Sequence, residues 1–169
     1  MKKLLSVFTL LIAMVAGTAT ALTITKVDKV NPNDDEWIDM ALTSAKASVS
    51  EGGKPCGAVV VLNGALRSVG RPTATATAEE TAIATSRRKK LNNAVIYTVN
   101  EPTTEAYNAI CRAGADAVVF VNSRDEVIAC GIYPAEAYND AAIDSTLTQV
   151  PMSQISYPEA ATFLKSNKK

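Results

Sequence analysis

The residues best suited to chemistry lie at the starts of two expected helices. Thr77 and Glu79 open the first helix, and Pro102, Thr103 and Thr104 open the second. A glutamate in the first turn can carry protons. Two helix starts that meet at one place also offer threonine hydroxyls and backbone N–H groups to a small polar or anionic ligand. The sequence therefore predicts Glu79 as a proton shuttle, with Thr77, Thr103 and Thr104 as ligand-binding residues.

The same residues also have a purely structural interpretation. Thr77 and Glu80 have the spacing of a capping box, in which the threonine caps the helix and the glutamate reaches back to its start. Glu79 is then an acid stabilised by the helix dipole. Pro102 starts the second helix, and Thr103 or Thr104 caps it. On this interpretation Glu79 has no catalytic role.

Composition excludes several kinds of site. The chain has no histidine, which removes Ser-His-Asp, Cys-His and H-E-x-x-H chemistry. Basic and acidic residues are equal in number, 17 of each, so the chain offers no general attraction to nucleic acid or acidic membranes. Cys56, Cys111 and Cys130 allow one disulfide in three pairings, or three buried thiols.

Residues 1–21 have the pattern of a secretory signal. Lys2 and Lys3 precede an apolar run, and Ala19 to Ala21 supply small residues for cleavage. No other segment is apolar enough to cross a membrane. We therefore expect an exported protein, periplasmic or secreted, with a single domain over residues 22–169 and a core over residues 35–167.

Hydrophobic patterns after residue 35 alternate between helix and strand. Asn63-Gly64 indicates a hairpin between strands over 57–62 and 65–70. This alternation predicts an α/β domain of three α/β/α layers, with a mixed sheet of about five strands covered on both faces. The remaining expected helices span 35–50, 77–90, 102–113, 134–143 and 157–166; the remaining strands span 94–99, 117–121 with an extension over 126–130, and 149–155.

The order of these motifs resembles the cytidine deaminase-like superfamily, in its guanine, cytosine and tRNA-adenosine deaminase branch. The resemblance extends from about Trp37 to Leu164 and includes CMP/dCMP-type deaminase domains. The stretches of this sequence that resemble the family are KPCGAVVV at 54–61, TAE at 77–79, YTVNEP at 97–102 and AICRAGADAVV at 109–119.

Members of that family hold zinc with H-x-E at the first helix start and P-C-x-x-C at the second. Here those ligand positions are Thr77, Thr103 and Ala106, whereas Glu79 and Pro102 match. A threonine hydroxyl is a poor zinc ligand and alanine is none. The resemblance therefore implies a pseudoenzyme without a zinc cofactor. A carboxylate site from Glu79, Glu101 and Glu105 for a harder ion is a further alternative.

Three functions remain open. The first is a non-catalytic domain that binds a small polar or anionic ligand or a protein partner. The second is an active nucleobase or nucleoside deaminase-type hydrolase with a relocated site and Glu79 as proton shuttle. The third is a structural or assembly module, since members of the resembled family often form homodimers.

Overall fold

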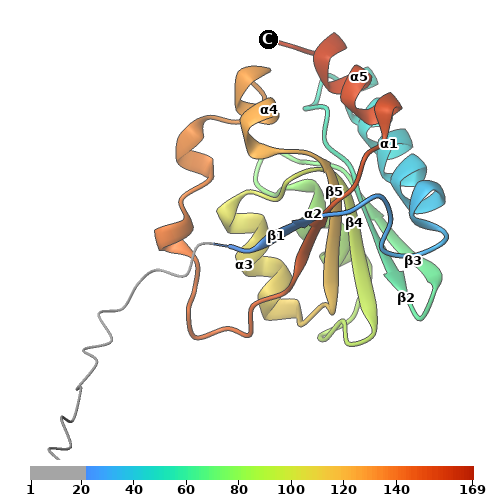
Figure 1. Cartoon of the computed structure of the whole chain (residues 1–169), viewed down its shortest axis with the longest axis vertical. Coiled ribbons are helices and arrows are strands. Elements are labelled where there is room, and N and C mark those ends of the chain that lie inside the picture. The colour runs from blue at the N-terminus through green and yellow to red at the C-terminus, as the bar shows by residue number, and fades with distance from the viewer. Residues whose placement is uncertain (1–21) are drawn as a thin grey trace, which may run out of the picture.

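A six-stranded mixed sheet organises residues 22–169, the part of the chain that the computed structural model describes (Figure 1). The predicted export signal at residues 1–21 lies outside the described residues. The strands are β1 (Ile24–Lys26), β2 (Ala58–Leu62), β3 (Ala65–Gly70), β4 (Ala94–Asn100), β5 (Ala117–Asn122) and β6 (Met152–Gln154). The helices are α1 (Asp34–Ser50), α2 (Ala78–Thr85), α3 (Thr104–Ala113), α4 (Arg124–Ala129) and α5 (Pro158–Ser166).

The strand order across the sheet is β1-β6-β5-β4-β2-β3. Strands β4, β5, β6 and β1 are parallel, while β2 pairs antiparallel with both β3 and β4. Asn63 and Gly64 have φ of 51° and 75°, the conformation that a tight hairpin requires and that Asn-Gly adopts readily. The predicted hairpin is thus confirmed.

Helices cover both faces of this sheet, as the three-layer prediction requires. Helices α1 and α5 pack on one face, where Trp37, Ile38 and Ala160 join a core with Val59 and Val119. Helices α2 and α3 pack on the other face, where Tyr107 and Ile110 join a core with Val60 and Phe120. The alternating β-branched strands therefore bury both sides, which is typical of a covered parallel sheet.

Two glycines let helices approach the sheet closely. A Cβ on Gly57 would lie 2.2 Å from the carbonyl oxygen of Ala41 in α1. A Cβ on Gly70 would lie 2.0 Å from the carbonyl oxygen of Ala78 in α2. Since no side chain fits in these gaps, the start of α2 is fixed directly against β3.

The structure differs from the prediction in four elements. The helix expected over 77–90 ends at Thr85, so the basic residues 87–90 follow it in a turn where Arg87 has φ 54°. The strand extension expected over 126–130 is α4, which Ser123 and Glu126 start with a capping box. The helix expected over 134–143 is two short 3₁₀ turns, at Ala135–Ala137 and Asp140–Ala142.

The fourth difference is β1, a strand of three residues that the sequence pattern did not reveal. It pairs parallel with β6, so that Lys26 lies opposite Gln154. The mixed sheet has this additional strand at one edge. Within residues 22–169, no helix has the length and apolar character needed to cross a membrane.

Candidate functional site

The start of α2 is held by the predicted capping box. The Thr77 hydroxyl oxygen accepts a hydrogen bond from the Glu80 amide at 3.3 Å, and Glu80 Oε2 accepts one from the Thr77 amide at 2.8 Å. Both predicted partners are therefore confirmed. The Thr77 hydroxyl oxygen already serves the helix, which limits what it can offer to a ligand or metal ion.

The start of α3 is held in a similar way. Thr103 Oγ1 accepts a hydrogen bond from the Ala106 amide at 3.3 Å. Thr103 is 6% exposed, and Ala106 is fully buried. Helices α2 and α3 contact one another, and Thr77 and Glu105 from their first turns line one cavity.

Glu79 lies beneath these helix starts, buried to 6% exposure. Thr98 Oγ1 is 2.7 Å from Glu79 Oε1 and 3.3 Å from the Gly57 carbonyl oxygen. The Thr98 hydroxyl has one proton, so it can donate a hydrogen bond to only one of these two oxygens. A protonated Glu79 would donate to Thr98, which would then donate to Gly57, and all three groups would be satisfied.

Burial also raises the pKa of Glu79, while the hydrogen bond from Thr98 opposes the rise. Glu79 makes no ion pair within residues 22–169. Burial of an unpaired carboxylate is costly, which favours the neutral acid. Glu79 can therefore hold a proton, as a shuttle must.

Cys56 is a neighbour of Glu79 that motif reasoning did not place in the site. Its sulfur accepts a hydrogen bond from Asn100 Nδ2 at 3.3 Å. Burial, with the nearby Glu79 carboxyl adding to it, raises the pKa of the Cys56 thiol to about 12. Because the thiolate is the nucleophile and the metal ligand, a thiol with this pKa is inert near neutral pH.

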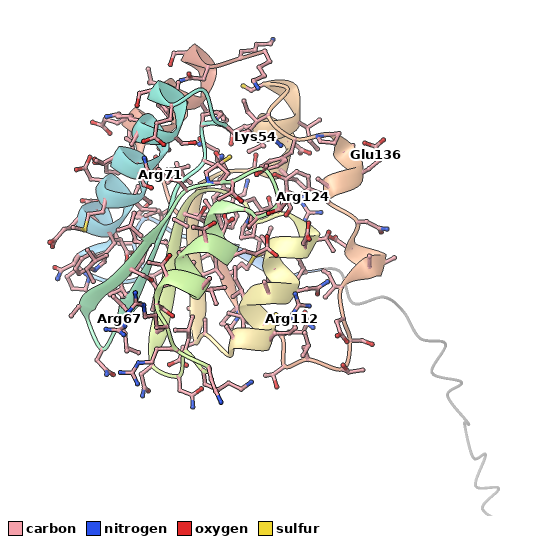
Figure 2. All side chains as sticks on the ribbon, turned by 180° about the vertical axis from the view of Figure 1, so that it is seen from behind. Lys54, Arg67, Arg71, Arg112, Arg124 and Glu136 are labelled. Carbon is pink, nitrogen blue, oxygen red and sulfur yellow. The ribbon has the colours of Figure 1, made fainter. Side chains whose placement is uncertain are left out.

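Tyr133 and Lys54 cover this buried group. Tyr133 lies near Cys56, whose proximity helps to raise the pKa of the Tyr133 hydroxyl, and Lys54 Nζ lies 3.9 Å from the centre of the Tyr133 ring. Figure 2 shows Lys54 and Arg124 at the same end of the domain, above the starts of α2 and α3. No sequence motif indicated Tyr133, because this residue lies in an irregular segment far from the two helix starts.

Outside this cover is an open cavity of about 620 Å³. Thr77 lines it, together with Lys54, Glu105, Tyr133 and residues 72–76. Glu79 and Thr103 do not line it, and Thr104 lines a separate hollow beside α3. Of the predicted ligand-binding residues, only Thr77 therefore faces this cavity.

Glu101 forms an ion pair with Arg124. Its carboxylate accepts hydrogen bonds from Arg124 Nε at 2.6 Å and from the Arg124 amide at 2.8 Å. Arg124 Nη1 also lies 3.0 Å from Asp140. Glu101 is therefore a structural ion-pair partner, and the described part of the chain has no group of three His, Cys, Asp or Glu side chains placed to hold a metal ion.

Comparison with known proteins identifies the fold. No family model and no curated protein matches the chain. The guanine deaminase of Nitrosomonas europaea has 16% identity and a TM-score of 0.67, over 84% of this chain and 87% of that one. The guanine deaminase of Bacillus subtilis has 25% identity and a TM-score of 0.59, over 78% and 91%.

A third structure, from work on tRNA:A34 deaminases, has 21% identity and a TM-score of 0.62, over 76% of this chain and 98% of that one. These proteins share the cytidine deaminase-like fold, and this chain has that fold as well. The predicted fold class is confirmed, and so is the resemblance to cytidine deaminase-like proteins at the level of the fold.

The residues at the expected metal positions do not fit zinc. Structural and catalytic zinc sites use Cys, His, Asp or Glu ligands. Here Thr77 and Thr103 present neutral hydroxyls that already accept hydrogen bonds from helix amides, and Ala106 presents a buried methyl group. We therefore derive no chemical step through a zinc ion at these positions.

The raised pKa of Glu79 makes stability depend on pH. From the usual glutamate value of 4.5 up to the raised value, the unfolded chain loses a proton that the folded chain keeps. The free energy of unfolding should therefore fall as pH rises through this window. Glu79→Gln removes this titration, so its stability relative to the parent should increase between about pH 4 and about pH 7.

Urea unfolding across that pH range measures the difference. Glu105→Gln, on the exposed side of the first turn of α3, controls for loss of a negative charge and should not reproduce the change. An advantage of Glu79→Gln that shrinks as pH rises would contradict the assignment of Glu79 as a buried neutral acid.

Proposed function

We propose that this deaminase-like domain is a binding protein that has lost zinc-dependent hydrolysis. The proposal rests on the residues at the three expected ligand positions. The hydroxyls of Thr77 and Thr103 cap helices, and Ala106 is a buried alanine. Without a metal ion, Glu79 can carry a proton but cannot generate hydroxide from water near neutral pH.

The open cavity beside Thr77 supports a small polar ligand. Its volume of about 620 Å³ lies in the range of small-molecule sites. Glu105 supplies a carboxylate, Lys54 a cation, and Tyr133 an aromatic ring with a hydroxyl. A planar ring that carries N–H donors and carbonyl or ring-nitrogen acceptors matches this combination.

Nucleobases have that chemistry, and fold neighbours have been solved with 8-azaguanine and 2,6-diaminopurine. The ligand proposed here is therefore a nucleobase or a related amidine, held without turnover. Export through the predicted signal at residues 1–21 would place this site in the periplasm or outside the cell, away from nucleic acid.

Calorimetry with 8-azaguanine tests the binding proposal. We expect saturable binding that Glu105→Gln weakens by about tenfold or more, because a hydrogen bond from a ligand N–H to a carboxylate contributes about 1.5–3 kcal/mol. Glu159→Gln is the matched control, since Glu159 also lies in the first turn of a helix but does not line this cavity. No saturable binding, or equal weakening by both variants, would contradict the proposal.

A second candidate is an active deaminase-type hydrolase with a relocated site. The similarity to guanine deaminases favours it, as does the retention of Glu79 as a buried acid at the start of α2. Glu79 would then act as the proton shuttle. This candidate predicts release of ammonia from a nucleobase, nucleoside or related amidine.

Glu79→Gln distinguishes this candidate, because the amide keeps the shape of the side chain but cannot carry the proton. Ammonia release should disappear in the variant while the folded state persists, as followed by circular dichroism. Equal turnover by parent and variant would reject Glu79 as the shuttle. An assembly role through a homodimer or another protein partner is the third candidate, and it would leave the nucleobase calorimetry without a signal.

A further inference from the structure

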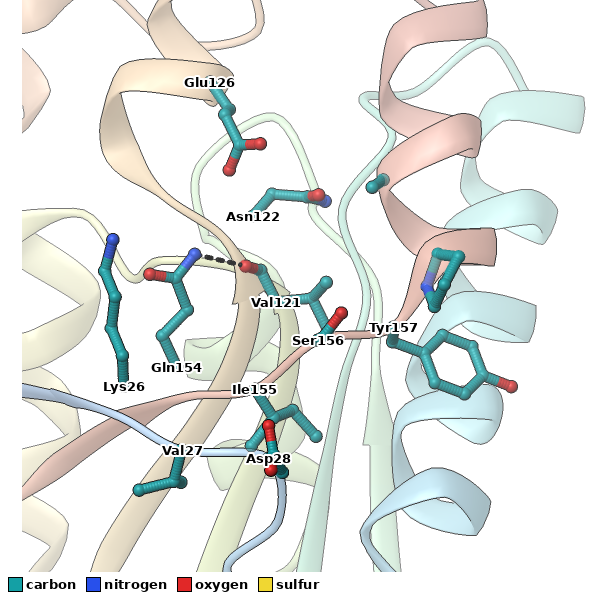
Figure 3. A pocket seen from close by; sticks show the side chains of 12 residues that line it. Lys26, Val27, Asp28, Val121, Asn122, Glu126, Gln154, Ile155, Ser156 and Tyr157 are labelled. Atoms are coloured by element: carbon teal, nitrogen blue, oxygen red, sulfur yellow. Dashed lines mark hydrogen bonds between the residues drawn. The ribbon is translucent and has the colours of Figure 1, made fainter.

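A second cavity lies at the carboxyl ends of β1, β6 and β5 (Figure 3). Its volume is about 370 Å³, and none of its lining residues lines the cavity beside Thr77. It is formed by the ends of three parallel strands together with Glu126 of α4 and the first residues of α5. None of the residues discussed for deaminase chemistry contributes to it.

The chain connections explain why a cavity forms here. After β5 the chain enters α4, whose Val127 packs in the core with α2 and α3. After β6 it enters α5, whose Ala160 packs in the core with α1. Neighbouring parallel strands whose connections leave toward opposite faces create a crevice at their carboxyl ends, which is where open α/β sheets bind ligands.

Asn122 places an unused acceptor in this crevice. The residue is only 2% exposed, and its Nδ2 donates to Asn100 Oδ1 at 3.0 Å and lies 3.5 Å from the Ala160 carbonyl oxygen. The orientation of the amide follows from the network, because Asn100 uses its own Nδ2 for the Pro55 carbonyl oxygen. Asn122 Oδ1 accepts no hydrogen bond from residues 22–169.

Asn122 lines the cavity, and its Oδ1 is not among the buried atoms that lack a partner, so this oxygen is free to accept a hydrogen bond from an N–H group of a ligand. Two further acceptors lie around the same cavity. Glu126 uses Oε2 for the amide and hydroxyl of Ser123, which leaves Oε1 free. Gln154 donates through Nε2 to the Val121 carbonyl oxygen at 2.8 Å, which leaves its own Oε1 free.

A positive group lies at the β1 side of the cavity. Lys26 is the register partner of Gln154 and forms no ion pair with the described residues. The start of α5 adds the positive end of its dipole, because Tyr157 provides no side-chain cap and Pro158 follows it. Figure 3 shows Lys26 on β1 and Glu126 on α4 at different sides of the cavity, and Asp28, Val27 and Ile155 also line it.

We propose that this cavity binds a free α-amino acid. The ammonium group donates to Asn122 Oδ1 and Glu126, and the carboxylate accepts from Lys26 at the β1 side of the cavity. The half-buried Val27 supplies apolar surface to the side chain of the ligand. The site joins acceptors and a cation within one cavity of suitable size, as a zwitterion requires.

Binding of the free proteinogenic amino acids to the purified chain tests the proposal. A thermal-shift screen at millimolar concentration would be followed by calorimetry of those that stabilise the protein. We expect saturable binding of at least one amino acid, which both Lys26→Gln and Glu126→Gln weaken by about tenfold. Both positions are exposed, so the variants should fold.

Two control variants match these changes. Glu80→Gln alters the equivalent capping-box residue of α2, and Lys46→Gln removes an exposed lysine from α1; neither residue lines the cavity. Both should leave binding unchanged. Acetate carries only the carboxylate group of an amino acid, and butylamine carries only the ammonium group. Each should therefore bind more weakly than the amino acid.

Three outcomes would overturn the inference. They are no saturable binding of any amino acid, equal effects of the cavity and control variants, and acetate or butylamine binding as tightly as the amino acid. Binding of 8-azaguanine at the cavity beside Thr77 is a separate measurement, so either proposal can fail while the other holds.

Discussion

The hydrogen bonds that cap α2 and α3 are the constraint on which the candidate site depends. In zinc deaminases of the resembled family, one metal ion would tie these two helix starts together. Here Thr77 and Thr103 complete each start from within the chain, through hydrogen bonds to the amides of Glu80 and Ala106. Caps of this kind contribute about 1 kcal/mol each, so the frame can persist without a metal ion.

Two further interactions stabilise the same end of the sheet. Glu101, at the end of β4, is held by both the side chain and the amide of Arg124. Glu79 is held by Thr98, with Cys56 and Tyr133 beside it. One carboxyl group is thus paired with a cation, and burial raises the pKa of the other. Glu79 and Glu101 therefore both have partners inside the protein, and neither lines the open cavity beside Thr77.

Much of the fold could be predicted from the sequence because its signals are local. The Asn63-Gly64 turn and the capping box of Thr77 and Glu80 each have a defined spacing, and the buried strands are rich in β-branched residues. The extension over 126–130 was wrongly predicted as a strand from its apolar residues, although Ser123 and Glu126 already had the capping-box spacing. The three residues of β1 are too few to show a period.

The site was less predictable because it depends on contacts between distant segments. Nothing in the motifs indicates that Tyr133 and Lys54 cover Cys56, or that Thr104 turns toward a separate hollow while Thr103 is buried. The pair of Asn100 and Asn122 follows from the register of β4 and β5, which only the folded sheet defines. Local sequence motifs indicated the two helix starts, whereas tertiary packing determines which side chains line the cavities.

The zinc content of the purified chain tests the central claim most directly. After incubation with zinc and exhaustive dialysis, elemental analysis should find no stoichiometric metal in the parent. The combined variant Thr77→His, Thr103→Cys and Ala106→Cys should retain zinc, because it restores three suitable ligands to the same frame. One tightly bound zinc ion per parent chain would contradict the account.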